Sequence, residues 1–217
     1  MNAHPVVYLI DDDPGVLRAL RRLLQAEAIA VQAFGSAEEF LLAHDPLAPG
    51  CVVLDIRLPC LSGLALQQAL LAADSARYIV FMTGHGDVAD SVQAMKAGAV
   101  DFLVKPFHDE DFLAAVRSAI ARDEHARAVR EEIEAIRWRL TTLTPREHQV
   151  LQHVVVGRLN KQIAADLGIA EKTIKVHRAR AMEKMGVGTL AELVRKSVKA
   201  EAGEHADDPG SPVDRAR

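Results

Sequence analysis

The sequence predicts an α/β domain with a parallel sheet over residues 1–121 and a small all-α domain over residues 141–200. In the first part, short apolar runs alternate with helical segments. The runs are apolar throughout, as are strands of a parallel sheet covered on both faces. After residue 140 only short helices are indicated. The net charge changes as well, from −7 over residues 1–121 to +6 over residues 141–200.

The composition is typical of a globular protein. The chain has 217 residues, of which 49% are apolar and 26% charged. Its longest uninterrupted apolar runs have five residues, whereas a membrane helix needs about 20. The first residues do not have the pattern of a secretory signal. Cys51 and Cys60 form no metal-ligand spacing and no disulfide framework. We therefore expect a reducing, cytoplasmic setting.

In the first domain each expected strand is followed by a helix. Ser36 and Glu39 have the spacing of a capping box at the start of the second helix. The pattern is (βα)₅, which predicts a doubly wound sheet. The strands are expected at 6–10, 28–34, 51–54, 78–82 and 100–104, and the helices at 14–27, 36–43, 62–73, 87–97 and from about 109.

The fifth helix has no clear end. A gap of nine residues separates Ile120 from Val129, where a second apolar set begins out of phase with the first. We interpret residues 122–140 as a helical linker. Two explanations of its apolar stripe stay open, a solvated charged helix and a contact with a partner or a second copy, as in a coiled coil.

Residues 141–200 predict four short helices. Thr144, Pro145 and Glu147 combine an N-cap, a proline in the first turn and an acid at N3, which is a strong helix start. Asn160 is expected to cap the second helix. Residues 201–217 contain almost no large apolar side chain, and we expect a disordered tail. The helices are expected at 145–156, 161–167, 171–185 and from about 189.

Acidic side chains follow two strands of the expected sheet. Asp11, Asp12 and Asp13 come after the first strand and Asp55 ends the third. In the flavodoxin-like strand order 2-1-3-4-5 these strands are neighbours, and ligands bind at their carboxyl ends. Crowded carboxylates need a counter-charge, which Mg²⁺ or Lys105 after the fifth strand can supply. An aspartate between a metal ion and an ammonium can form an aspartyl phosphate.

A structural explanation competes for part of this set. Asp13 followed by Pro14 is typical of a helix N-cap with proline at N1, and capping alone accounts for Asp13. Packing does not explain why Asp55, Thr83 and Lys105 stand at the ends of the third, fourth and fifth strands.

The motifs IDDDP, VVLDIRLP, FMTGHGD and VDFLVKPF resemble the receiver domain of two-component response regulators, and the TGHGD run is similar to the FixJ branch. The resemblance implies that Asp55 is the phosphoacceptor and that Lys105 pairs with the phosphoryl group. The implied Mg²⁺ ligands are Asp12, Asp55 and the backbone carbonyl of Arg57, with Asp11 in an indirect role.

The resemblance also implies a switch. The Thr83 hydroxyl would turn to a phosphoryl oxygen, and Phe102 would rotate inward with it. The bond between Lys105 and Pro106 would be cis.

Some residues depart from the family pattern or invite another role. Cys60 stands where glycine is common, so a positive φ there would be strained. We hypothesise that Arg57 reaches the bound phosphoryl group and alters dephosphorylation. His85 and His108 lack a second metal ligand at suitable spacing, and we treat all the histidines as surface or structural residues.

The third helix of the second domain has two different faces. A short connection containing Gly168 joins it to the second helix, which fits a helix-turn-helix. Basic side chains on its outer face can neutralise phosphates or reach guanine, and Val176 there suits a thymine methyl group. Ordinary solvation of a basic face is the competing explanation. The expected buried stripe is Ile174, His177, Ala181 and Met185; the outer face carries Lys172, Lys175, Val176 and Ala179, with Thr173, Arg180 and Lys184 at its margins.

The segments TPRE, NKQIA and TIKVHR resemble the four-helix DNA-binding domain of the LuxR/NarL/FixJ type. The resemblance implies that Lys175 and Val176 enter the major groove. Ala170 occupies the N-cap of this recognition helix, where losing a Ser or Thr costs about 1 kcal/mol. The residues expected to contact DNA are Lys161, Lys172, Thr173, Lys175, Val176, Arg178, Arg180 and Lys184, of which Lys161, Arg178, Arg180 and Lys184 would hold the backbone.

Together the resemblances cover residues 6–199 and imply a DNA-binding response regulator. A sensor histidine kinase is expected to phosphorylate Asp55, and the surface of the fourth helix and fifth strand is expected to dimerise in response. The expected partners are the kinase, promoter DNA, a second copy of the chain and, at the promoter, RNA polymerase; no membrane partner is expected. We expect no catalysis beyond phosphorylation and dephosphorylation of Asp55 itself.

Two alternatives stay open at this point. One is a metal-dependent phosphohydrolase with Asp55 as nucleophile, which would need a substrate pocket and a further acid or base. The other is a phosphorylation-independent DNA-binding protein that uses the first domain as a dimerisation scaffold. The complete set of acids and Lys105 argues against the scaffold, which has no use for them.

Overall fold

The computed structural model describes residues 4–73, 77–84 and 88–206. The chain divides into two compact units, residues 1–127 and residues 128–217. The predicted boundaries at 121 and 141 enclose this division, which falls inside the expected linker. Each unit has its own apolar core.

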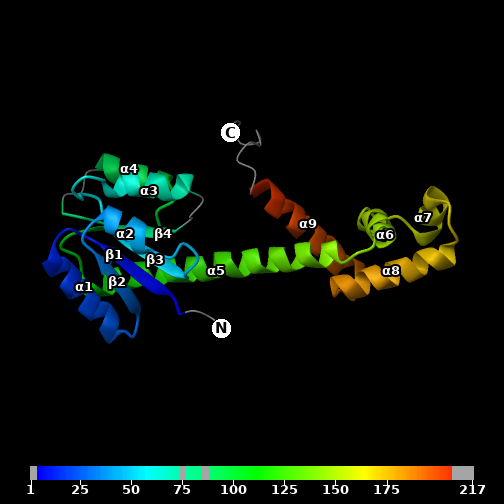
Figure 1. Ribbon diagram of the computed structural model, residues 1–217, viewed down its shortest axis with the longest axis horizontal. Helices are drawn as coiled ribbons and strands as arrows, with labels where there is room; N and C mark the ends of the chain where they lie inside the picture. The colour runs from blue at the N-terminus through cyan, green and yellow to red at the C-terminus, as the bar shows by residue number, and fades with distance from the viewer. Residues whose placement is uncertain (1–3, 74–76, 85–87, 207–217) are drawn as a thin grey trace. The chain divides into compact units, whose positions relative to one another are not determined.

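The N-terminal unit is a parallel sheet between two layers of helices (Figure 1). Its strand order, β2-β1-β3-β4-β5, is the predicted one, with Val6 paired to Ala30 and to Gly50 on the two neighbouring strands. The strands are β1 (Val6–Ile10), β2 (Ala30–Phe34), β3 (Gly50–Asp55), β4 (Tyr78–Thr83) and β5 (Asp101–Val104). The helices are α1 (Pro14–Ala26), α2 (Ala37–Ala43), α3 (Gly63–Ala72), α4 (Val88–Lys96) and the first part of α5 (Asp109–Thr141).

Alternate strand residues supply the two cores. Val7, Leu9 and Val53 pack with α1 and α5 on one face of the sheet, whereas Tyr8 and Leu54 pack with α2, α3 and α4 on the other. Because both faces are covered, the central strand β3 is buried along its whole length. This burial explains why its sequence is continuously apolar up to the aspartate that ends it.

Local signals set most helix starts, and one strand begins later than expected. Ser36 Oγ accepts from the Glu39 amide (3.2 Å), but Glu39 reaches back to the amide of Gly35. Strand β2 begins at Ala30 instead of residue 28, because Ala28 has a positive φ of 56° and closes the end of α1. The expected start of the fourth helix at residue 87 lies outside the described residues.

Residues 122–140 do not form a separate element, because α5 is one helix of 33 residues. The Asp123 side chain is buried in the N-terminal unit, where Oδ2 accepts from the Gly50 amide and from Arg127 Nε, both at 2.8 Å. Further along, Ile136 is buried in the core of the C-terminal unit. The first part of the predicted linker therefore packs in the N-terminal unit through Asp123, and its last part packs in the C-terminal unit through Ile136. Val129 and Ile133, which lie between these residues in sequence, are half-buried.

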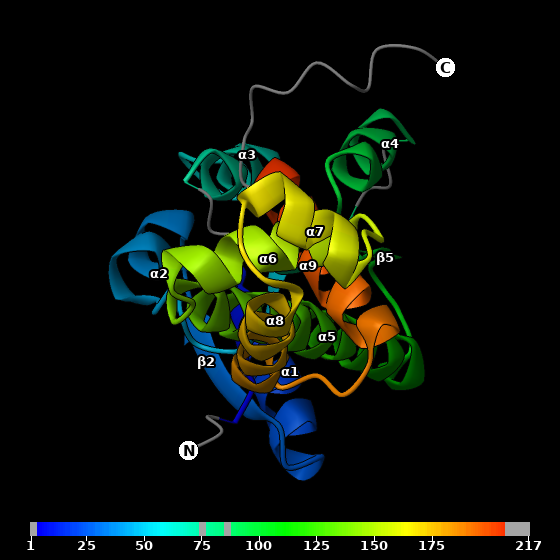
Figure 2. The same ribbon diagram turned by 90° about the vertical axis from the view of Figure 1, so that its right-hand side faces the viewer.

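The C-terminal unit gathers the end of α5 with α6 (Pro145–Val155), α7 (Asn160–Leu167), α8 (Glu171–Met185) and α9 (Leu190–Ala206). Figure 2 shows α6, α7 and α8 grouped together. The predicted stripe of α8 is confirmed for Ile174, Ala181 and Met185, which are fully buried, while His177 is half-buried. Thr144 and Glu147 form the predicted capping box.

Two expectations for this unit are wrong in detail. Asn160 is the first residue of α7 and not its N-cap, which is Leu159. The Asn160 side chain instead accepts from Arg178 (3.1 Å), and Gln162 Oε1 accepts from the Leu159 amide. Helix α9 continues to Ala206 instead of ending at 200, because residues 201–206 are mostly Ala and Glu and the next proline is residue 209.

Within the described residues, no helix combines the length and apolarity that crossing a bilayer requires.

Candidate functional site

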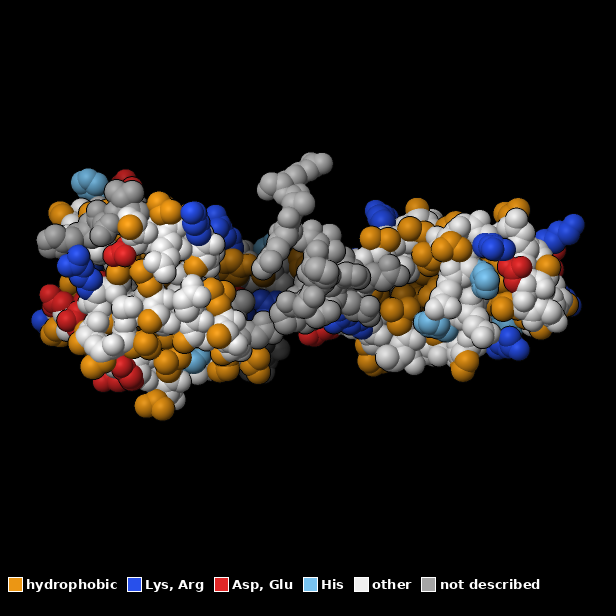
Figure 3. Space-filling model, turned by 90° about the horizontal axis from the view of Figure 1, so that it is seen from above, with side chains coloured by type: hydrophobic (Ala, Val, Ile, Leu, Met, Phe, Trp, Pro, Cys, Tyr) orange, Lys and Arg blue, Asp and Glu red, His pale blue; other side chains and the backbone are white. Residues whose placement is uncertain are grey.

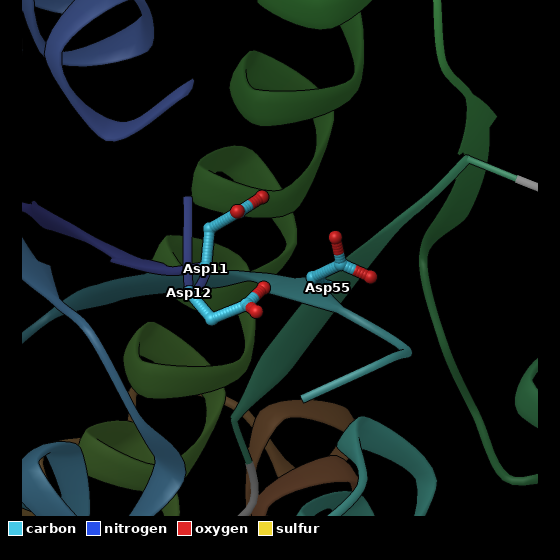
Figure 4. Close-up of side chains that lie close together, drawn as sticks. All are labelled: Asp11, Asp12 and Asp55. Carbon is cyan, nitrogen blue, oxygen red and sulfur yellow. The ribbon is translucent and has the colours of Figure 1, made fainter. Parts of the chain in front are cut away.

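Three carboxylates meet at the carboxyl ends of neighbouring strands (Figure 4). Asp11 and Asp12 follow β1, Asp55 ends β3, and an oxygen of each lies within 4.8 Å of the others. Asp11 is 1% and Asp55 7% exposed, whereas Asp12 faces solvent. The sheet therefore brings together the acids that the sequence predicted, two of them in a buried position where they need a counter-charge.

Lys105 supplies that counter-charge. Its Nζ lies 2.6 Å from Asp11 Oδ2 and 2.6 Å from Asp55 Oδ2. The backbone amide of Lys105 donates to the Thr83 carbonyl, and the following bond to Pro106 is cis, as predicted. Burial raises the pKa of Asp11 despite the hydrogen bond from Lys105. Burial opposes the charge of Lys105, but hydrogen bonds to Asp11 and Asp55 outweigh it and raise the pKa of Lys105.

Backbone amides hold the other carboxylate oxygens. Asp11 Oδ1 accepts from the Asp13 amide (2.9 Å), and Asp55 Oδ1 accepts from the Arg57 amide (2.8 Å). Each buried acid therefore has one oxygen fixed by backbone and the other on Lys105. Asp13 itself accepts from the Gly15 amide (2.6 Å), so its predicted role as N-cap of α1 is confirmed.

The second candidate site is the outer face of α8 in the C-terminal unit. The predicted residues Lys172, Thr173, Lys175 and Arg180 are exposed, as is Lys161 on α7. Val176 is 43% exposed, so core packing does not account for this apolar side chain. Lys175 Nζ lies 3.2 Å from Glu171 Oε1, an exposed i,i+4 partner on the same helix. Figure 3 shows Lys and Arg side chains spread over the surface of this unit.

Comparisons with known proteins match both units. Residues 7–117 match the response regulator receiver domain, and residues 141–197 match the luxR family of bacterial regulatory proteins. Nodulation protein W of Bradyrhizobium diazoefficiens is 44% identical over 192 residues, covering 88% of this chain and 85% of that protein. The transcriptional regulatory protein FixJ of Azorhizobium caulinodans is 44% identical over 194 residues, covering 89% and 92%.

The protein is a response regulator with a LuxR-type DNA-binding domain. Among solved structures, the response regulator StyR matches with a TM-score of 0.83 and 44% identity, covering 91% of this chain and all of that one. Full-length FixJ from B. japonicum matches with a TM-score of 0.57 and 42% identity, covering 92% and 98%.

In the receiver domain the expected switch residues lie on adjacent strands. Thr83 is buried at the end of β4 and pairs in register with Val104 of β5. Phe102 is half-buried and packs against the core on the α2, α3 and α4 face. His108 is exposed, and His85 lies outside the described residues.

The loop after Asp55 has two special backbone positions. Cys60 has a φ of 68°, so the loop keeps the left-handed conformation that favours glycine although a cysteine stands there. A Cβ on Gly63 would lie 2.4 Å from the Asp55 carbonyl oxygen, so α3 can begin this close to the acid only with glycine there. Sequence reasoning missed Gly63, although a glycine one residue after the N-cap Ser62 was a visible signal.

In the DNA-binding domain, two predicted backbone contacts have internal partners. Lys184 Nζ lies 2.7 Å from Glu147 Oε2 and 3.0 Å from the Thr142 carbonyl oxygen. The hydrogen bond from Lys184 lowers the pKa of Glu147 to about 2. Arg178 donates to Asn160 on α7. A phosphate contact of Lys184 would compete with these bonds, because this ammonium already joins α8 to the start of α6.

The acidic pocket of the receiver domain fits a divalent cation. Carboxylate oxygens are ligands that Mg²⁺ prefers, and Asp12 is exposed where it could complete a site with Asp55. Asp11 is turned to Lys105 and to the Asp13 amide, which suits the indirect role expected of it.

Proposed function

We propose that this response regulator accepts a phosphoryl group on Asp55 from a sensor histidine kinase and controls transcription in response. The observation that carries the proposal is the position of Lys105, whose ammonium lies 2.6 Å from both Asp55 and Asp11 in a largely buried site. A scaffold would gain nothing from a buried cluster of like charges that needs a cation to hold it together.

The chemistry is a single group transfer. An oxygen of Asp55 attacks the phosphorus of a phosphohistidine, an O–P bond forms, and the P–N bond breaks as the imidazole leaves. Lys105 lies where it can stabilise the negative charge that develops on the phosphoryl oxygens. Mg²⁺, held by Asp12, Asp55 and the backbone carbonyl of Arg57, with Asp11 in an indirect role, would neutralise further charge. The protein is otherwise not an enzyme.

The receiver surface supports dimerisation as the response. The α4–β5 face exposes Val92 (45%), Met95 (47%) and Val104 (50%). Burying such side chains against a second copy is favourable, because apolar area is removed from water. In this proposal, phosphorylation rearranges Thr83 and Phe102, and the rearranged α4–β5 face then binds the same face of a second copy.

The DNA-binding domain then reads a promoter through α8. Lys175 and Val176 enter the major groove, with Lys172 and Thr173 beside them. Arg180 and Lys161 contact phosphates, and Arg178 can do so while it holds Asn160. A dimer places two such helices on two half-sites, where RNA polymerase can be a partner. In this proposal the protein binds promoter DNA in the cytoplasm.

Arg57 has a separate part in the proposal. Its amide holds Asp55, and its side chain is exposed beside the site. We expect its guanidinium to reach the phosphoryl group and change the lifetime of the aspartyl phosphate. An unchanged lifetime in Arg57→Ala would refute this role, with Arg22→Ala, which removes an exposed guanidinium on α1, as the matched control.

One experiment tests the core of the proposal. The full chain is treated with acetyl phosphate and Mg²⁺, and mass spectrometry locates the added group; Asp55→Asn and Asp45→Asn are treated alongside. We expect one phosphoryl group on residue 55, lost only in Asp55→Asn, together with dimerisation and tighter promoter binding. Label on another residue refutes the proposal. Turnover of a phosphomonoester far beyond one equivalent favours a phosphohydrolase, and promoter binding by Asp55→Asn equal to that of the phosphorylated protein favours a scaffold.

A further inference from the structure

The start of α8 carries an acid among basic residues. Residues 158–180 hold six Lys or Arg side chains and two acids, Asp166 and Glu171. Asp166 is on α7 and accepts from Arg158 (2.7 Å). Glu171 is the acid in the first turn of α8, where its Oε1 lies 3.2 Å from Lys175 Nζ. This carboxylate therefore stands beside a residue that the proposed function places in the major groove.

Both side chains of this pair are open to solvent. Glu171 is 45% and Lys175 64% exposed. Glu171 is the first residue of the helix, and its N-cap, Ala170, provides no side-chain hydrogen bond. In a helix-turn-helix, the N-terminal residues of the recognition helix contact base edges. In the proposed function, Glu171 is thus at the end of α8 that approaches the bases.

Helix stability explains only part of this placement. An acid in the first turn interacts favourably with the helix dipole, and an i,i+4 pair of opposite charge adds a little to helix stability. On a DNA-binding face, however, a carboxylate is repelled by phosphates and loses water when DNA binds. An acceptor buried without a donor is unfavourable, so Glu171 needs a donor for the oxygen that does not face Lys175. The donors that the major groove offers are the amino groups of cytosine and adenine.

The spacing of the pair matches one kind of base pair. Lys175 Nζ is a donor and Glu171 Oε1 an acceptor, 3.2 Å apart. In the major groove guanine O6 is an acceptor and cytosine N4 a donor, and these atoms lie side by side because they are hydrogen-bonded to each other. Guanine N7, beside O6, is a second acceptor for an ammonium with three N–H groups. Thymine O4 and adenine N6 are also neighbours, but a methyl group and not a second acceptor lies beside O4.

We propose that Glu171 and Lys175 together read one G·C base pair. The Lys175 ammonium donates to guanine O6 and N7, and the Glu171 carboxylate accepts from the N4 amino group of the paired cytosine. The inference rests on the proposed function, because it requires α8 to enter the major groove. It adds Glu171 as a specificity-determining residue and states which base pair this residue selects.

The pair also lowers the attraction to other sequences. A lysine ammonium is attracted to DNA of any sequence, and a carboxylate beside it opposes this attraction. Where a different base pair places an acceptor against Glu171, two acceptors meet and no hydrogen bond forms. Glu171 therefore gains a hydrogen bond at the correct base pair and reduces affinity at the others.

The test is selection of bound sites from a random duplex pool by the full chain, treated with acetyl phosphate and Mg²⁺. We expect the wild-type sites to contain a G·C pair whose replacement weakens binding about tenfold. Glu171→Ala should reduce the preference at that base pair, and Lys175→Met should reduce it at the same base pair. Because the two side chains act on one base pair, the effects of the two substitutions should not add in the double variant.

Two further variants separate base reading from helix stability. Glu171→Asp keeps the charge at the start of α8 on a side chain one methylene shorter, so it should also lose the preference, whereas a role limited to the helix dipole predicts no change. Glu183→Ala, the matched control, removes an exposed acid in the last turn of α8 and should keep the preference.

Three results would overturn the inference while the proposed function stands. They are an unchanged preference in Glu171→Ala, relaxation of different base pairs in Glu171→Ala and Lys175→Met, and a shared base pair that is A·T. A wild-type chain that selects no sequence would contradict the proposed function, and the inference with it.

Discussion

Substituting Asp123 tests whether the receiver domain extends beyond its family match, which ends at residue 117. Asp123 is 1% exposed, and Oδ2 accepts from the Gly50 amide and from Arg127 Nε. In Asp123→Ala the Gly50 amide stays buried without this acceptor. The Arg127 guanidinium keeps only its bonds to the Leu47 and Ala48 carbonyls. Removing one partner of a buried ion pair costs about 3–5 kcal/mol.

The Arg127 side chain is 28% exposed, so solvent screens part of this loss. We expect Asp123→Ala to lower the free energy of unfolding of the receiver domain by about 2–4 kcal/mol. That is a large part of the roughly 5–15 kcal/mol that stabilises a domain.

Urea unfolding followed by circular dichroism measures the loss, and hydrogen exchange of the Gly50 amide reads the broken bond directly. Glu124→Ala, an exposed acid on the next position of the same helix, is the control and should change stability by less than about 0.5 kcal/mol. If the two variants are equally stable, the receiver domain does not depend on this contact.

Three further predictions follow from the ion pairs. Lys105→Met removes the hydrogen bond and the charge that oppose the burial of Asp11 and leaves only the bond from the Asp13 amide, so NMR titration should give an Asp11 pKa above that of the wild type. The Glu147 pKa is lowered to about 2 when folded, so the pair with Lys184 stabilises the DNA-binding domain above pH 4.5 and loses this effect between pH 4.5 and about 2. Glu147→Gln should therefore cost about 1–3 kcal/mol at pH 7 and progressively less as the pH falls from 4.5 through about 2, as measured by thermal unfolding across that range. Lys161→Ala, at a proposed phosphate contact, should weaken promoter binding and reduce its salt dependence by about one counterion, whereas Lys184→Met should lower stability and leave the salt dependence unchanged.

Local patterns predicted most of the fold because each depends on neighbours in sequence. The limits of α8 follow from its apolar stripe and from Gly186, whose positive φ ends it. The acidic cluster was also predictable, because parallel strands bring their carboxyl ends to one edge. What the sequence could not reveal is which of several equivalent residues finds a distant partner. Asp123 lies 73 residues from Gly50, and Lys184 lies 37 residues from Glu147.

If Asp55 is phosphorylated as proposed, the arrangement around Lys105 connects the modified residue to the surface of β5. Its ammonium holds the Oδ2 atoms of Asp11 and Asp55, and each acid is already fixed by a backbone amide through Oδ1. A phosphoryl group on Asp55 adds a charge of about −1.5 to −2, so Lys105 must redistribute its hydrogen bonds while the acids stay in place. Because the Lys105 amide is bonded to the Thr83 carbonyl and Val104 precedes it on β5, that redistribution acts directly on the edge of the sheet. The half-exposed side chain of Val104 therefore lies one residue from Lys105, so in the proposed function β5 connects Asp55 to the α4–β5 face.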